Sequence, residues 1–268
     1  MAINSIGPSN AFQQTTSNIQ RASERISSGS QINSAADNAA GLAISNRLSS
    51  QITESHQARS NASDGISYLQ VADGGLSSIT QGLQRIQELS LQAANGTLNT
   101  SDRKALNNEA QQLKDEITRT IETTSFNGQS ILNNDREVGV QLGDSDSDNI
   151  SVDVQNFADI LDNTNFEDLD ISSVDGAQAA LGVVEELQTQ VTNSSAEIGA
   201  QLNRLDSSIN SLFDNEINVT ASRSRIEDAD IAKEITELTA NTIKQNVEIA
   251  LQSQANAQGK NVLRLLGG

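Results

Sequence analysis

Two long stretches of this chain place apolar residues at alternating spacings of three and four, and little in the sequence would interrupt a helix. In the first stretch these positions are Leu69, Ala72, Leu76, Ile79, Leu83, Ile86 and Ala93, with polar Ser90 standing between the last two. This spacing puts the apolar side chains on one face of an α-helix. The chain contains a single proline, Pro8, and proline is the strongest helix breaker. Long helices are therefore predicted.

The second stretch lies in the C-terminal half and predicts a helix over about 176–213. One face of that helix carries Val184, Leu187, Val191, Ile198, Leu202, Leu205, Ile209 and Leu212, with a polar interruption around Ser194. A shorter helix is predicted to carry Leu106, Ala110, Leu113, Ile117 and Ile121. It follows the turn "NGTLNTSD", and its N-cap is expected at Ser101 or Asp102.

The middle of the chain loses the helical pattern. Val138, Val140 and Leu142 alternate with polar residues, and so do Ile150, Val152 and Val154 after an Asp- and Ser-rich turn. This alternation predicts a β-hairpin over about 137–155. Residues 156–175 show no clear period and are predicted to be irregular.

Four glycines, Gly65, Gly74, Gly75 and Gly82, lie inside the helix that is predicted to run from Leu42. Each costs a helix roughly 1 kcal/mol relative to alanine. Their presence indicates either close backbone packing or local breaks. The preceding segment, "SSGSQINSAADNAAG", is rich in small and polar residues and is predicted to be a loop.

The two ends of the chain carry weaker apolar patterns. Phe12, Ile19 and Ile26 are seven residues apart, which is the repeat of a coiled-coil seam. A C-terminal helix is predicted to start near Asp228 or Asp230, where acidic residues suit the helix dipole. Its apolar residues include Ile235, Leu238, Ile243 and Val247, and then Val262, Leu263, Leu265 and Leu266 in the tail "NVLRLLGG". Neither end buries enough area alone to offset its ordering entropy, so both are expected to pack against partners.

These patterns predict a mainly α fold with a small β-hairpin in the middle. The two distant chain ends carry weak matching apolar stripes and are expected to pair with each other.

Composition argues against several classes of function. The net charge of −18 opposes binding to nucleic acid and to anionic membranes, and no stretch approaches the 18 apolar residues of a membrane span. The N-terminus lacks the features of a cleavable signal peptide. An amphipathic protein that binds membrane surfaces remains a second class, although it would need a basic polar face.

The sequence does not predict an enzyme or a cofactor site. His56 is the only histidine and cysteine is absent, which excludes a zinc site of the His-x-x-x-His type and leaves little for a hydrolase or metalloenzyme. Asp144, Asp146 and Asp148 imitate the start of a calcium-binding loop. However, Asn149 and Gln155 occupy the positions where such a loop requires Gly and Glu.

Several long motifs resemble bacterial flagellin, the subunit of the flagellar filament, in the order in which that family has them. They are "RISSGSQINSAADNAAGLAISNRL", "ARSNASDGISYLQVADGGLSSI", "LQRIQELSLQAANGT", "FNGQSIL", "ASRSRIEDADIAKEITELT" and "SQANAQGKNVLRLLGG". The resemblance covers nearly the whole chain. Because only about fifty residues separate "FNG" from the second long apolar stripe, the chain resembles a minimal flagellin without large variable domains. Hook–filament junction proteins of the same family are the related alternative.

The resemblance implies a self-assembling structural subunit for swimming motility. It further implies that the N- and C-terminal segments pair as a long antiparallel helical bundle or coiled coil. Residues 1–42 and 220–268 would form one domain that lines the inner tube of the filament, with polymerisation contacts from Phe12, Ile19, Ile26, Ile235, Leu238, Ile243, Val247 and the four apolar tail residues. Residues 43–219 would form a second domain, which builds the outer tube and includes the hairpin. The resemblance also implies secretion by type III export to the extracellular filament. The partners implied are other copies of the chain, an export chaperone, the filament cap and the hook-junction proteins.

The resemblance further implies contact with an innate immune receptor of animal hosts. Aligned on "LQRIQELSLQ" and "FNG", the contacting residues are Arg85, Leu89 and Glu109. Gln87 stands where the family usually has a second basic residue, which lowers the expected affinity. A purely structural interpretation assigns Arg85 and Glu109 to solvated helix charges and Leu89 to packing.

Overall fold

The computed structural model describes residues 8–145 and 147–266, with side chains described from Asn10 to Asn261. The chain divides into two compact units. Unit 1 comprises Met1–Ile52 with Glu216–Gly268, and unit 2 comprises Thr53–Asn215. Unit 1 combines the two ends of the chain, and unit 2 is the continuous segment between them.

The described residues are mostly helical, as predicted. The helices are α1 (Pro8–Ser28), α2 (Ala35–Ala93), α3 (Thr100–Thr123), α4 (Phe157–Asn163), α5 (Val174–Glu227) and α6 (Ile231–Leu266), with a short 3-10 turn η1 (Phe166–Asp168). The strands are β1 (Ser125–Phe126), β2 (Gln129–Ser130), β3 (Val138–Gln141) and β4 (Asn149–Val152). The mainly α fold class with a small β region is confirmed.

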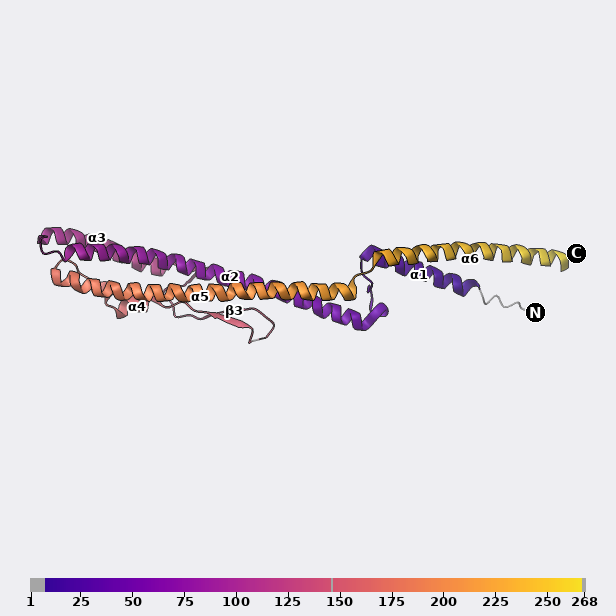
Figure 1. Cartoon of the computed structure of the whole chain (residues 1–268), viewed down its shortest axis with the longest axis horizontal. Coiled ribbons are helices and arrows are strands. Elements are labelled where there is room, and N and C mark those ends of the chain that lie inside the picture. Colours follow the sequence, from indigo (N-terminus) through magenta and orange to yellow (C-terminus); the bar gives the residue numbers. More distant parts are fainter. Residues whose placement is uncertain (1–7, 146, 267–268) are drawn as a thin grey trace. The chain divides into compact units, whose positions relative to one another are not determined.

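The core of unit 2 lies where α2, α3 and α5 run side by side (Figure 1). The predicted stripe of α2 is buried along its whole length, with every apolar member from Leu69 to Ala93 at most 1% exposed. Ser90 is also fully buried, and its hydroxyl donates to the Ile86 carbonyl at 2.7 Å. A polar residue is tolerated in this stripe because the preceding helical turn satisfies its hydroxyl.

Helix α2 runs without a break through Gly65, Gly74, Gly75 and Gly82, and three of these four glycines serve close packing. A Cβ on Gly65 would lie 2.9 Å from Val140, one on Gly75 would lie 2.8 Å from Leu132, and one on Gly82 would lie 2.9 Å from Ile117. A Cβ on Gly74 would meet nothing within 4 Å. Three of the four glycines therefore allow a neighbouring side chain to reach the α2 backbone.

The predicted hairpin is confirmed. Strands β3 and β4 pair antiparallel, with Val138 opposite Val152 and Val140 opposite Ile150. A second, smaller hairpin was not predicted, although its signal is present in the sequence. Asn127 and Gly128 have φ angles of 51° and 76° and connect β1 to β2, as expected for an Asn-Gly turn between two strands.

The prediction of an irregular segment over 156–175 was wrong. Helix α4 and turn η1 form there, and they bury Phe157 and Phe166. The Asn156 side chain caps α4 by accepting from the backbone N–H groups of Ala158 and Asp159. The segment is too short to show a helical period, and it folds because unit 2 provides a core for its aromatic side chains.

Two predicted helix starts were also wrong. The N-cap of α3 is Asn99, whose side chain accepts from the Asp102 N–H, so the helix begins earlier than expected. Helix α2 begins at Ala35 and not at Leu42, with one non-helical residue at Asn38. By contrast, Asp230 accepts from the Lys233 N–H at 3.1 Å and so caps α6, as predicted.

Candidate subunit interface

Helices α1 and α6 pair antiparallel in unit 1 through polar side chains (Figure 1). The Thr15 hydroxyl donates to Glu248 Oε1 at 3.1 Å. Farther along the pair, Arg25 Nη1 donates to Glu234 Oε1 at 3.3 Å. Both contacts join residues more than two hundred positions apart in the sequence, so they fix which parts of the two helices face each other.

We call the buried and half-buried line along this contact the polar seam. Its members recur every three or four residues: Thr15, Asn18, Ala22 and Arg25 on α1, and Glu234, Leu238, Asn241, Gln245 and Glu248 on α6. That is the spacing of a coiled coil, but among these residues only Ala22 and Leu238 are apolar, and the half-buried Ile19 and Ile26 flank them on α1. A seam of this composition sets register without burying much apolar area. The pair gains little stability from its own contact.

The apolar residues of α1 that were expected to form the coiled-coil seam are not all covered in the single chain. Phe12 is 38% exposed, whereas Thr15 and Ala22 occupy the most buried positions of α1. Ile19 and Ile26 are half-buried, as Asn18 and Arg25 are. They lie on the same face of α1 as Thr15 and Ala22, because positions three residues after each member of the repeat belong to the same coiled-coil seam.

On α6 the apolar residues form an exposed row. Ile231, Ile235, Ile243, Val247 and Leu251 fall on one line of positions four residues apart, which polar Thr239 interrupts between Ile235 and Ile243, and the five apolar residues are between 39% and 64% exposed. We call these five residues the apolar ridge. Residues along an i+4 line make the ridges that fit the grooves of another helix. Ile231 and Leu251 were not among the predicted polymerisation contacts and extend that set. The side chains of Val262, Leu263, Leu265 and Leu266 lie outside the described residues.

The charged residues suggested as receptor contacts form an ion-pair cluster in unit 2. Arg85 donates to Glu109 Oε1 from Nε at 2.9 Å and from Nη2 at 2.7 Å. It also donates to Glu88 at 2.8 Å. Hydrogen bonds to Glu88 and Glu109 raise the pKa of Arg85 above its ordinary value. Leu89, in contrast, is 1% exposed and packs in a small core with Ala93, Ala110 and Ile171, so its side chain does not reach the surface of the folded unit.

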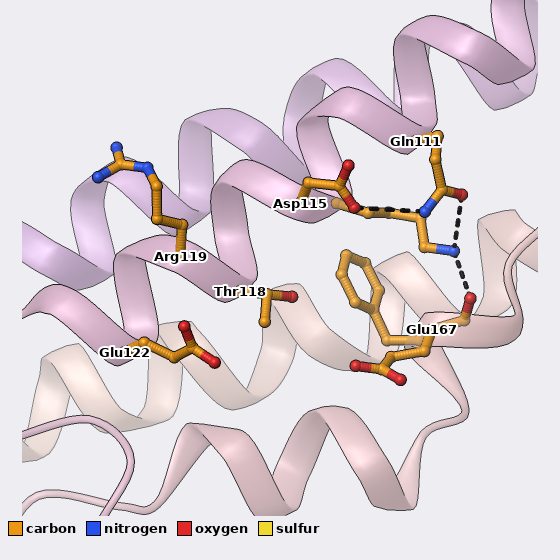
Figure 2. Close-up of a pocket in the computed structure, with 8 residues that line it drawn as sticks. Gln111, Asp115, Thr118, Arg119, Glu122 and Glu167 are labelled. Atoms are coloured by element: carbon orange, nitrogen blue, oxygen red, sulfur yellow. Dashed lines mark hydrogen bonds between the residues drawn. The ribbon is translucent and has the colours of Figure 1, made fainter.

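A groove beside α3 holds the one strongly buried lysine described in unit 2. Figure 2 shows Gln111, Asp115 and Thr118 of this groove on α3, with Glu167 of η1 opposite. Lys114 is 4% exposed, and its Nζ donates to the carbonyls of Glu167 and Leu169 and to Gln111 Oε1. Burial lowers the pKa of Lys114. This lysine ties η1 to α3, and the contacts satisfy its donors within the fold.

Among the described residues, no group of three or more His, Asp or Glu side chains could hold a metal ion. No described helix combines the length and the apolar character needed to cross a membrane.

Family models account for most of the chain. The bacterial flagellin N-terminal helical region matches residues 3–137, and the bacterial flagellin C-terminal helical region matches residues 181–266. The chain belongs to the bacterial flagellin family.

Curated relatives support this membership over nearly full length. The flagellin of Halalkalibacterium halodurans is 39% identical over 92% of this chain and 91% of its own. The flagellin of Bacillus subtilis is 37% identical over 96% of this chain and 95% of its own. Since these relatives have no large additional domain that this chain lacks, the chain is a minimal flagellin.

Solved structures agree with that assignment. A crystal structure of Bacillus cereus flagellin is 31% identical and covers 57% of this chain and 88% of its own, with a TM-score of 0.52. A putative flagellar hook-associated protein of Vibrio parahaemolyticus has a TM-score of 0.64 and covers 72% of this chain and all of its own, but at 18% identity it shows the shared fold alone. The flagellin matches favour a subunit of the filament itself over a junction protein. Flagellins are structural proteins, and this chain is a structural subunit of the flagellar filament.

Proposed function

We propose that this flagellin polymerises chiefly through the outer faces of α1 and α6, which unit 1 leaves uncovered. The observation that carries the proposal is the exposure of the apolar ridge of α6: mostly polar residues occupy the contact between the two helices, with Ile19 and Ile26 half-buried beside them, while the ridge faces outward. Exposed contiguous apolar surface of this kind marks an interaction site.

Phe12 on α1 and the apolar ridge on α6 would be covered by neighbouring copies. Complete burial of a large aliphatic side chain is worth about 1.5–3 kcal/mol, and these residues are already partly covered. The five ridge residues would contribute roughly 5 kcal/mol per subunit before ordering costs. The predicted tail contacts of Val262, Leu263, Leu265 and Leu266 would add to this sum. A head-to-tail contact that does not close into a ring generates a helical filament.

Seeded assembly tests this proposal. Monomeric protein is mixed with sheared filament fragments, and growth is followed by light scattering and negative-stain electron microscopy. The variant carrying Ile243→Ser and Val247→Ser should lose most of its growth, because both side chains are more than half exposed in the single chain. The control, Asn246→Ser, changes an exposed polar side chain on the same helix and should grow normally.

Growth of the double variant at the rate of the control would reject the role of the ridge. The same assay separates a filament subunit from a junction protein or an amphipathic surface-binding protein. Filaments that lengthen in proportion to added monomer support the filament subunit, whereas addition that stops after a short cap supports a junction protein. Binding to anionic vesicles without any filaments would support the surface-binding class.

The domain assignment and the remaining partners belong to the same proposal. Residues 1–42 and 220–268 would form the inner layer of the filament, and 43–219 the outer layer. The subunit would leave the cell by type III export, with a chaperone covering its C-terminal helices, and would meet the cap and the hook-junction proteins outside. Support comes from family membership and from the uncovered apolar ridge, which would need shielding before assembly.

Recognition by an animal innate receptor is a second proposal with a narrower basis. Arg85 and Glu109 offer a paired charge on the surface of unit 2, while burial removes Leu89 from the contacting set. A reporter-cell assay with Arg85→Ala and Glu109→Ala would test it, using Glu122→Ala as a control on the exposed face of α3. A response to the two variants equal to that of the control would reject receptor contact at this pair.

A further inference from the structure

The sequence contains two Asn-Gly dipeptides, Asn95–Gly96 and Asn127–Gly128. In such a pair, the glycine nitrogen can attack the side-chain carbonyl carbon of asparagine, because glycine has no Cβ to hinder the approach. The fold holds the two dipeptides in opposite ways. We propose that Asn95 is a site of spontaneous deamidation in the folded protein and that Asn127 is protected by its turn.

The loop between α2 and α3 activates the Asn95 side chain. Asn95 Oδ1 accepts two hydrogen bonds from Thr97, one from the backbone N–H at 3.1 Å and one from the hydroxyl at 3.0 Å. This Asx turn folds the side-chain amide back over the following peptide. The two donors also polarise the Asn95 carbonyl and stabilise the negative charge that develops on its oxygen during attack.

The attacking nitrogen is available. Within the parts of the chain that the structure describes, the Gly96 N–H donates to no other atom. Asn95, Gly96 and Thr97 are all exposed, so water reaches the loop. A Cβ built on Gly96 would meet nothing within 4 Å, so no neighbouring group crowds the Gly96 Cα.

The second dipeptide has a conformation that opposes ring closure. Asn127 has a φ of 51° and Gly128 a φ of 76°, and Phe126 pairs with Gln129 directly beside them. In the left-handed region, ψ is about +30 to +60°, which turns the next backbone nitrogen away from Cβ. Attack on Asn127 therefore requires the β1–β2 hairpin to open first.

The reaction needs water as its only co-reactant. A bond forms between Gly96 N and Asn95 Cγ, the Cγ–Nδ2 bond breaks, and Nδ2 leaves as ammonia with the proton from Gly96. The product is a five-membered succinimide. Water then opens this ring at either carbonyl and yields aspartate or isoaspartate at position 95.

The two products differ in their effect on the loop. Arg103 Nη2 donates to the Asn95 carbonyl oxygen at 2.9 Å, and its Nε donates to the Ala93 carbonyl at the end of α2, also at 2.9 Å. Aspartate keeps the main chain in place and can still accept from Thr97. Isoaspartate adds a methylene to the main chain and so moves the carbonyl away from Arg103. Accumulated isoaspartate is expected to loosen the α2–α3 connection.

The test follows both sites in the full-length protein at mildly alkaline pH, where the attacking nitrogen is more readily deprotonated. Peptide mass spectrometry measures deamidation, and methylation by an isoaspartyl methyltransferase with labelled S-adenosylmethionine measures isoaspartate. We expect Asn95 to react about tenfold faster than Asn127 in the folded protein, a barrier difference of about 1.4 kcal/mol. In concentrated urea the two rates should converge.

Equal rates in the folded protein, or a faster Asn127, would overturn the proposal. So would a faster reaction of Asn95 in urea, because the native loop would then be protective. Two variants test the activating bond. Thr97→Val removes the hydroxyl donor and should slow Asn95 about three- to tenfold, while Thr97→Ser keeps the donor and should retain the rate. Identical deamidation rates for both variants would show that the Thr97 hydroxyl does not activate Asn95 and would overturn the proposal.

Discussion

Arg25 of α1 donates to Oε1 of Glu234 on α6 at 3.3 Å, while the other carboxylate oxygen of Glu234 is buried and has no hydrogen-bond partner among the described residues. A half-satisfied carboxylate in a helix contact stabilises register more than it stabilises association. The Arg25–Glu234 pair therefore fixes how α1 and α6 align, but it adds little to the free energy of their association.

Because the polar seam contributes little stability, we expect α1 and α6 to be poorly protected against protease in the dilute monomer. Arg25→Ala leaves the Glu234 carboxylate buried without its partner, and should weaken the α1–α6 pair by about 1–3 kcal/mol. The double change of Arg25→Met with Glu234→Leu replaces the ion pair by apolar contact and should strengthen the α1–α6 pair. Limited proteolysis of the monomer measures both effects as cleavage rates within α6.

Lys233→Met is the matched control for that comparison, because it changes an exposed side chain next to the seam. Its cleavage rate should equal that of the natural sequence. If the single chain already resists protease throughout α1 and α6, the need for neighbouring copies is refuted.

Substitution by alanine should have opposite effects on the free energy of unfolding at Gly82 and at Gly74. Gly82→Ala places a methyl group 2.9 Å from Ile117, well inside van der Waals contact, and should lower the free energy of unfolding of unit 2 by about 1–3 kcal/mol. Gly74→Ala meets no neighbour and should raise it by up to about 1 kcal/mol. Urea unfolding followed by circular dichroism measures both, and equal effects would refute close packing at Gly82.

We expect removal of the Lys114 amino group to destabilise the region around η1. Lys114→Met leaves the carbonyls of Glu167 and Leu169 without their buried donor and should cost about 1–3 kcal/mol. Hydrogen exchange should increase first around η1. Lys104→Met, at an exposed position of α3, is the control, and an equal response of the two variants would exclude a specific role for Lys114.

We expect the hydrogen bonds that Asp37 accepts at the start of α2 to be lost in acid. Asp37 accepts hydrogen bonds from the hydroxyl and the backbone N–H of Ser34, both at 2.9 Å, and these bonds lower the pKa of Asp37 below its usual value of 3.8. Because the folded pKa is lower, the contribution to stability is complete above the unfolded pKa. It is lost as the pH falls through the folded pKa.

Amide exchange of residues 34–41 should therefore rise when the pH drops below about 3.8, before the core of unit 2 opens. Asp37→Asn should show that faster exchange already at neutral pH, with little further change on acidification. An unchanged pH profile in this variant would exclude Asp37 as the titrating group.

Local rules were sufficient where one face of an element is buried inside its own unit. The stripe of α2 from Leu69 to Ala93, the existence of the β3–β4 hairpin and the Asp230 cap could all be predicted, because period and capping chemistry are properties of short segments. The glycines inside α2 predicted either close packing or a break in the helix. The short distances to Val140, Leu132 and Ile117 show that three of them allow close packing.

The tertiary structure decided what local rules left ambiguous. The seven-residue repeat of Phe12, Ile19 and Ile26 does not by itself say how deeply each residue is buried, and the packing against α6 half-buries Ile19 and Ile26 but leaves Phe12 exposed. Helix α4 and turn η1 form because a core receives Phe157 and Phe166, not because their short sequence is periodic. Burial of Leu89 and exposure of the apolar ridge have the same origin: a helix has several faces, and the amino-acid pattern of one helix does not specify which neighbour will cover each of them.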